Sequence, residues 1–228
     1  VESVSKCRSP LCIRRIRMRE PRAEGLGWRF GGKMVRGEQV HFSLPEKLNL
    51  GSYFLDVNLE SGRGEKTAIY FKDGTASFRD LWLLTNRIGN VLKELGVAPE
   101  NRVLLILEDS PDWVATWLAT MKLGAVGTHA YTYLTPNDYA YLLDLVRPKV
   151  VVADCRTLAR VREAAEGLKY PRAILVSGAG VPDLRKGEFG LCRMLEAADE
   201  RLEPAPTHRD DIAFWNFSGG TTGKPKGV

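Results

Sequence analysis

The sequence lacks most features that mark membrane, secreted or structural-metal proteins. No stretch approaches about 18 uninterrupted apolar residues, so a membrane-spanning helix is not expected. The four cysteines, Cys7, Cys12, Cys155 and Cys192, are widely spread and do not suggest a disulfide scaffold. Cys7 and Cys12 have no third or fourth ligand nearby, which argues against a zinc site. These absences favour a cytoplasmic protein without a bound structural metal.

The sequence also lacks a basic excess outside its first 43 residues. The net charge is +5, but residues 1–43 hold 10 Lys or Arg against 4 Asp or Glu, and the other 185 residues hold 23 against 24. Residues 1–43 have weak periodicity and no apolar core of a secretory signal. One interpretation of residues 1–43 is a transit peptide. Another is a nucleic-acid-binding arm, because Trp28 and Phe30 lie among basic residues. We expect a disordered extension there, and neither a nucleic-acid nor a membrane partner for the rest.

From residue 44 onward, apolar runs alternate regularly with helical patterns. An amphipathic helix is expected around Tyr53, Phe54, Val57 and Leu59, followed by a hairpin over residues 67–78 and a helix that begins with a capping box at Ser77. Apolar strands are expected at residues 103–107, 125–130, 150–153 and 173–176, with helices between them. A helix over 189–201 and a strand over 212–217 complete the pattern. This βαβ rhythm predicts an α/β fold with a parallel sheet.

Several residues that could carry chemistry have simpler interpretations. Trp113 and Trp117 lie one helical turn apart and are predicted to pack in the core. Glu108 and Asp109 precede a predicted helix start at Ser110, where negative charge complements the helix dipole. The histidines are isolated from one another in the sequence, so packing or exposure explains them better than catalysis: His41, His129 and His208.

The chemistry is concentrated in a glycine-threonine segment, residues 218–227, directly after the last predicted strand. It reads Ser218, Gly219, Gly220, Thr221, Thr222, Gly223, Lys224, Pro225, Lys226 and Gly227. Glycines let backbone N–H groups approach phosphate oxygens, hydroxyl groups donate hydrogen bonds, and lysine supplies positive charge. The segment therefore predicts a phosphate-binding loop rather than a plain glycine hairpin.

The phosphate-binding loop of P-loop NTPases does not fit this segment. From Gly219 to Gly223 the spacing is one residue too short for G-x-x-x-x-G-K. Pro225 stands where a Ser or Thr would ligate magnesium. Pro225 also disfavours a helical conformation at Lys224, so a helix is not expected to start there.

The glycine-threonine segment closely resembles the signature loop of adenylate-forming (AMP-binding) enzymes. That signature is usually written (S/T)-S-G-(S/T)-T-G-x-P-K-G. The segment departs from it at one position, Gly219, where the family usually has Ser. Weaker likeness to benzoate–CoA ligase-type enzymes covers residues 52–56, 62–69, 134–143 and 211–215. The resemblance favours the acid–CoA ligase branch over luciferase-like or peptide-synthetase adenylation branches.

This resemblance implies a two-step reaction on an aryl or short acyl carboxylic acid. ATP with Mg²⁺ gives an acyl-AMP and pyrophosphate, and coenzyme A then displaces AMP. Phosphate binding would fall to Ser218, Gly219, Gly220, Thr221, Thr222, Gly223, Lys226 and Gly227, with Lys226 supplying charge and Lys224 at a variable position. The resemblance places the catalytic lysine and the metal-binding glutamate further along the chain. Residues 44–228 are then expected to form a partial, truncated AMP-binding domain that is inactive alone; a non-catalytic nucleotide-binding module is the alternative.

Overall fold

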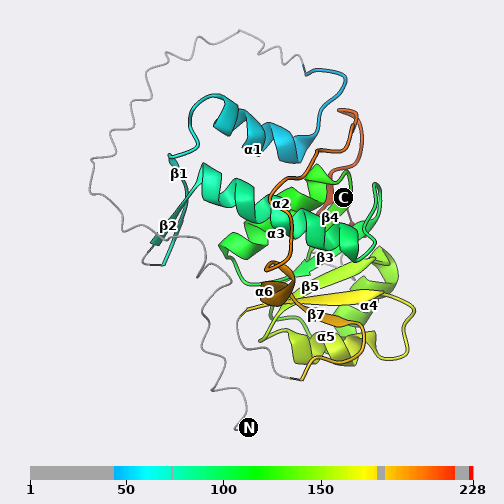
Figure 1. Cartoon of the computed structure of the whole chain (residues 1–228). Coiled ribbons are helices and arrows are strands. Elements are labelled where there is room, and N and C mark those ends of the chain that lie inside the picture. The colour runs from blue at the N-terminus through cyan, green and yellow to red at the C-terminus, as the bar shows by residue number, and fades with distance from the viewer. Residues whose placement is uncertain (1–43, 73, 179–182, 219–225, 228) are drawn as a thin grey trace, which may run out of the picture.

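The computed structural model describes residues 44–72, 74–178, 183–218 and 226–227 and shows a parallel sheet with helices on both faces (Figure 1). The sheet has six strands in the order β7-β6-β5-β3-β4-β8, and every adjacent pair is parallel. Its strands are β3 (Arg102–Ile106), β4 (Val126–His129), β5 (Val150–Asp154), β6 (Ala173–Ser177), β7 (Glu188–Gly190) and β8 (Phe214–Trp215). The predicted α/β class is confirmed.

Two helical layers cover the sheet. One layer holds α1 (Leu50–Glu60), α2 (Phe78–Glu94) and α3 (Pro111–Lys122), and the other holds α4 (Pro136–Val146) and α5 (Leu158–Ala165) (Figure 1). Successive side chains of a strand point to opposite faces, so a strand covered on both sides must be apolar throughout. In β3, Val103 and Leu105 enter the core under α2 and α3, while Leu104 and Ile106 enter the core under α4 and α5.

The helix starts follow the capping patterns in the sequence. Ser77 and Asp80 form a capping box at the start of α2, and Thr135 and Asp138 form another at α4. Ser110 caps α3, and Pro111 occupies its first position. The predicted hairpin is also present, as β1 (Thr67–Phe71) paired antiparallel with β2 (Gly74–Ser77).

The prediction of a helix over residues 189–201 is wrong. The chain first forms β7, which pairs with β6, and the helix that follows, α6 (Leu191–Met194), is only four residues long. A side-chain contact favours the strand, because Arg162 of α5 donates two hydrogen bonds to the Glu188 carboxylate at 2.8 and 2.6 Å. Local sequence could not reveal this partner, which lies 26 residues away.

The single strand predicted over residues 212–217 is wrong as well. The segment divides at Asn216 into β8, which extends the parallel sheet, and β9 (Phe217–Ser218), which pairs antiparallel with β10 (Lys226–Gly227). The two short strands serve different sheets, so one continuous strand could not satisfy both partners. The apolar run in the sequence carries no signal for this change.

Helix α1 forms where expected but buries the other face. Gly51 and Leu55 are buried, whereas Tyr53, Phe54 and Val57 are exposed. A Cβ atom at Gly51 would lie 2.6 Å from the backbone oxygen of Leu118 in α3, so α1 and α3 approach closely at this glycine. The close approach decides which side of α1 turns inward. Within the described residues, no helix has the length and apolar character that a membrane crossing requires.

Candidate phosphate-binding site

The glycine-threonine segment begins and ends in a two-stranded ribbon at the carboxyl edge of the sheet. β8 runs parallel to β4, with Phe214 opposite Gly127 and Trp215 opposite Thr128. One residue later β9 starts, and its Ser218 lies opposite Lys226 of β10. Directly opposed residues of antiparallel strands lie about 4.5–5.5 Å apart. The backbone therefore closes on itself at the two ends of the segment.

The structure describes the backbone of three of the eight predicted site residues. The backbones of Ser218, Lys226 and Gly227 belong to the ribbon. The remaining five lie outside the described residues: Gly219, Gly220, Thr221, Thr222 and Gly223. The roles assigned to all eight stay predictions.

The continuation after Pro225 excludes the NTPase type of loop on structural grounds. In P-loop NTPases the lysine opens a helix, whereas here the chain continues as the extended strand β10. The carboxyl ends of the strands are the usual ligand-binding edge of an open α/β sheet. The ribbon lies at this edge, because it follows the carboxyl end of β8 after a single residue.

A second group of polar residues lies at the same edge, between β3 and β5. The connections leaving these two neighbouring strands run to opposite sides of the sheet, which makes this the topological switch point. The Asp154 carboxylate accepts hydrogen bonds from the backbone N–H groups of Glu108, Arg156 and Thr157, at 3.1, 2.8 and 2.9 Å. Arg156 forms an exposed ion pair with Glu108 at 2.5 Å. Glu108 thus has a partner that its position before a helix did not predict.

Asp112, in the first turn of α3, has an unusual environment. Its side chain is fully buried and accepts a hydrogen bond from Ser177 at 2.5 Å, while its second carboxyl oxygen has no hydrogen-bond partner. Burial raises the pKa of the Asp112 carboxyl, and the hydrogen bond from Ser177 opposes this rise only in part. No local pattern predicts this burial, because Asp112 follows Ser110-Pro111 like an ordinary exposed acid at a helix start.

Residues missed by the sequence interpretation carry only weak local signals. Asp154 and Thr157 hold the turn after β5 through an Asx-type arrangement, and the Thr157 hydroxyl donates to the Ile106 carbonyl at 2.9 Å. An Asp three residues before a Thr at a strand end is the pattern that could have identified the turn. The contact across to β3 needs the tertiary fold.

The two described histidines, His129 and His208, lie apart and have local contacts. His129 ends β4 with its ring edge-to-face against Trp113 at 5.9 Å, and the His208 backbone N–H donates to Asp211 at 2.7 Å. Among the residues with described positions, no group of three or more His, Cys, Asp or Glu could hold a metal ion. The packing interpretation of Trp113 and Trp117 holds, since both contact the main core.

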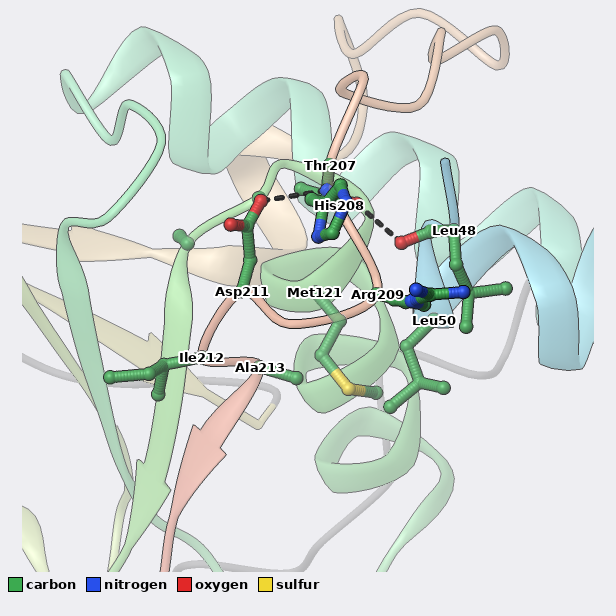
Figure 2. A pocket seen from close by; sticks show the side chains of 11 residues that line it. Leu48, Leu50, Met121, Thr207, His208, Arg209, Asp211, Ile212 and Ala213 are labelled. Carbon is green, nitrogen blue, oxygen red and sulfur yellow. Dashed lines mark hydrogen bonds between the residues drawn. The ribbon is translucent and has the colours of Figure 1, made fainter. Parts of the chain in front are cut away.

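A hollow of about 60 Å³ lies elsewhere, beside the segment that leads into β8 (Figure 2). Its lining combines apolar residues, among them Leu48, Leu50, Met121 and Ile212, with the polar residues Thr207, His208, Arg209 and Asp211. Gly124 and Ala125, which also line it, precede β4, so the hollow is at the amino edge of the sheet. Small-molecule sites are commonly about 300–1,000 Å³, so this hollow suits water and not a nucleotide.

Comparison with known proteins adds a consistent family pattern. The family model described as AMP-binding enzyme matches residues 58–228. The chain is 38% identical over 176 residues to a 4-hydroxybenzoate–CoA/benzoate–CoA ligase of Rhodopseudomonas palustris, covering 77% of this chain and 32% of that protein. It is 34% identical over 186 residues to a benzoate–CoA ligase of Thauera aromatica, covering 81% and 34%.

Solved structures show the same relationship. The crystal structure of the anthranilate CoA ligase AuaEII with anthranoyl-AMP matches with a TM-score of 0.75 and 34% identity, over 81% of this chain and 35% of that one. A benzoate CoA ligase from Burkholderia xenovorans matches with a TM-score of 0.68 and 29% identity, over 79% and 34%. The chain thus spans about a third of the length of the relatives it matches.

Proposed function

Because this chain belongs to the family of AMP-binding enzymes, we propose that it forms part of an ATP-dependent acid–CoA ligase for an aromatic carboxylic acid. Benzoate, hydroxybenzoate and anthranilate ligases are among its relatives, and they support the aromatic class. In this proposal residues 44–228 are part of the AMP-binding domain, and residues 1–43 are an extension to it. ATP, coenzyme A and the acid are the substrates of the whole protein.

The proposed reaction has two steps. The substrate carboxylate attacks the α-phosphorus of ATP, which forms an acyl-AMP and releases pyrophosphate. The thiol of coenzyme A then attacks the acyl carbon, which forms the thioester and releases AMP. Mg²⁺ would be bound together with the ATP phosphates. Its positive charge would act on them alongside that of Lys226.

The task of this chain is to hold the β- and γ-phosphates while pyrophosphate leaves. Negative charge grows on the leaving group, so positive charge and hydrogen-bond donors fixed beside it lower the barrier. We assign Lys226 to charge, Thr221 and Thr222 to hydroxyl contacts, and Gly220 and Gly223 to backbone access. The observation that supports this most is the pairing of Ser218 with Lys226, which returns a lysine to the start of the segment at the carboxyl edge.

Pyrophosphate release across a panel of acids tests the proposal. The longer protein that it implies would be incubated with ATP and coenzyme A, plus benzoate, 4-hydroxybenzoate, anthranilate or 4-hydroxybutyrate. We expect acid-dependent release that is fastest with an aromatic acid, and a CoA thioester detected by mass spectrometry.

The panel separates the alternatives. Acyl-AMP without thioester would point to another adenylate-forming branch. Nucleotide binding without release for any acid would contradict the ligase assignment and support a non-catalytic module. Preference for 4-hydroxybutyrate would overturn the aromatic class only.

A further inference from the structure

The ribbon that closes the glycine-threonine segment is joined to the described core through a very short strand. β8 has two residues and lies at the edge of the sheet, where β4 is its one partner among the described strands. The Gly127 N–H donates to the Ala213 carbonyl at 3.0 Å, just before β8 begins. So few backbone contacts leave the position of β8 weakly fixed, and side-chain packing must supply the remainder.

An aromatic stack supplies this packing from α3. The Trp117 and Phe214 rings lie 5.4 Å apart between centroids, and Trp113 stacks on Trp117 at 5.9 Å with an interplanar angle of 21°. His129 completes the stack against Trp113 at 5.9 Å. Trp117 is thus the residue that connects the helix to the ring of β8. We call these four residues the aromatic stack.

Gly127 makes room for the stack on the sheet. A Cβ atom at Gly127 would lie 3.3 Å from Cδ1 of Trp117, closer than ordinary contact. The missing side chain lets the indole lie against β4 beside the point where Phe214 pairs with it. Backbone pairing and ring packing therefore meet at one place, Gly127 opposite Phe214.

We propose that Trp117 is a positioning residue for nucleotide binding. Its contact with Phe214 holds β8 in place, and β8 in turn sets the position of the ribbon from which the glycine-threonine segment begins. Only Asn216 separates β8 from β9, so a shift of Phe214 is passed to Ser218 over four residues. Trp117 itself need not touch the nucleotide. The nucleotide part of this proposal rests on the proposed function, whereas the mechanical part does not.

Hydrogen exchange tests the mechanical part on the chain itself. In Trp117→Leu, the backbone amides of residues 217, 218, 226 and 227 should lose protection by about 10-fold, the size expected when an aromatic contact is lost. Trp117→Phe, which keeps a ring, should retain most of it. Phe78→Leu is the matched control, because it removes an aromatic ring from the same helical layer but not from the aromatic stack.

The control decides the interpretation. Loss of ribbon protection in Trp117→Leu but not in Phe78→Leu supports the proposal. Equal loss in both variants, or none in either, overturns it. If Trp117→Leu does not fold, Phe214→Leu removes the other half of the contact and is judged by the same outcomes.

Kinetics test the nucleotide part in the longer protein. Trp117→Leu should raise KM for ATP by about 3- to 10-fold and leave KM for the acid unchanged, with Trp117→Phe close to wild type. A uniform loss of kcat with unchanged KM values would contradict positioning. If the wild-type protein turns over no acid, the proposed function fails, and the exchange experiment still decides whether Trp117 holds the ribbon.

Discussion

Lys226 lies opposite Ser218 in the ribbon, at the point where the glycine-threonine segment returns to the sheet edge. If it carries charge to the departing pyrophosphate, Lys226→Ala should lower the adenylation rate of the longer protein by about 100-fold, the usual loss when one transition-state donor is removed. Pre-steady-state pyrophosphate release measures this rate. Lys224→Ala, two residues away, should be close to wild type, and both variants should melt like the wild type. Equal rates for the two variants would end the assignment of Lys226.

Asp112 makes stability depend on pH. Burial raises the pKa of its carboxyl, so the folded state binds the proton more tightly than the unfolded state does. The stabilising contribution is complete below the unfolded pKa of about 3.9 and is lost as pH rises through the higher folded value. Asp112→Asn keeps the group neutral and should be more stable than wild type at neutral pH by about 1 kcal/mol.

Urea denaturation between pH 4 and 8 would measure this difference, which should shrink toward acidic pH. Asp109→Asn is the control, because Asp109 is exposed just before the same helix. A stability difference that stays constant across this range would show that the Asp112 carboxyl is not responsible.

Three helices are joined by one buried charged group. Lys122 of α3 forms an ion pair with Asp56 of α1 at 2.8 Å and donates to the Asn86 side-chain oxygen of α2 at 3.0 Å. The Lys122 side chain is 2% exposed, so its charge depends on these partners. Trp82 and Ser52 donate to the two oxygens of Asp56, each at 2.5 Å. The network fixes how α1 lies on α2 and α3.

Asp56→Ala should lower the free energy of unfolding by about 3 kcal/mol, because it leaves a buried ammonium group without its counter-charge. The double variant Asp56→Ala/Lys122→Met removes the charge as well and should recover part of that loss. Chemical denaturation of both variants provides the test. Glu60→Ala, an exposed acid on the same helix, should change stability by less than about 0.5 kcal/mol. If the double variant is no more stable than Asp56→Ala, the unpaired Lys122 charge does not cause the loss of stability.

For the molecule as a whole, the decisive question is how much of a site this chain contains. The described residues provide the ribbon at the carboxyl edge and a core that supports it. The chain spans 32% of the Rhodopseudomonas relative, so the complete ligase reaction is proposed only for a longer protein. We therefore expect the 228 residues alone to show no carboxylate-dependent exchange between ATP and pyrophosphate. Radiolabel exchange measures this, and activity above a Lys226→Ala control would contradict it.

Much of this molecule was determined by the sequence alone. Continuous apolar runs predicted β3, β5 and β6, because a strand covered on both faces has no polar position. Ser77 and Ser110 predicted two helix starts, because capping depends on a hydrogen bond within one turn. Pro225 excluded an NTPase loop, because it restricts the residue before it. Each of these features is decided by neighbours in the chain.

The tertiary structure decided what depends on distant partners. Glu188 became part of β7 because β6 offered an unpaired edge and Arg162 a counter-charge, so the predicted helix shortened. α1 buried Gly51 because the backbone of α3 approaches it there. Trp117 was predicted to pack in the core, but only the fold brought it against Phe214 beside β4. Hydrogen bonds within a turn are encoded locally, whereas the choice of an exposed or buried face depends on surfaces that meet only after the chain has folded.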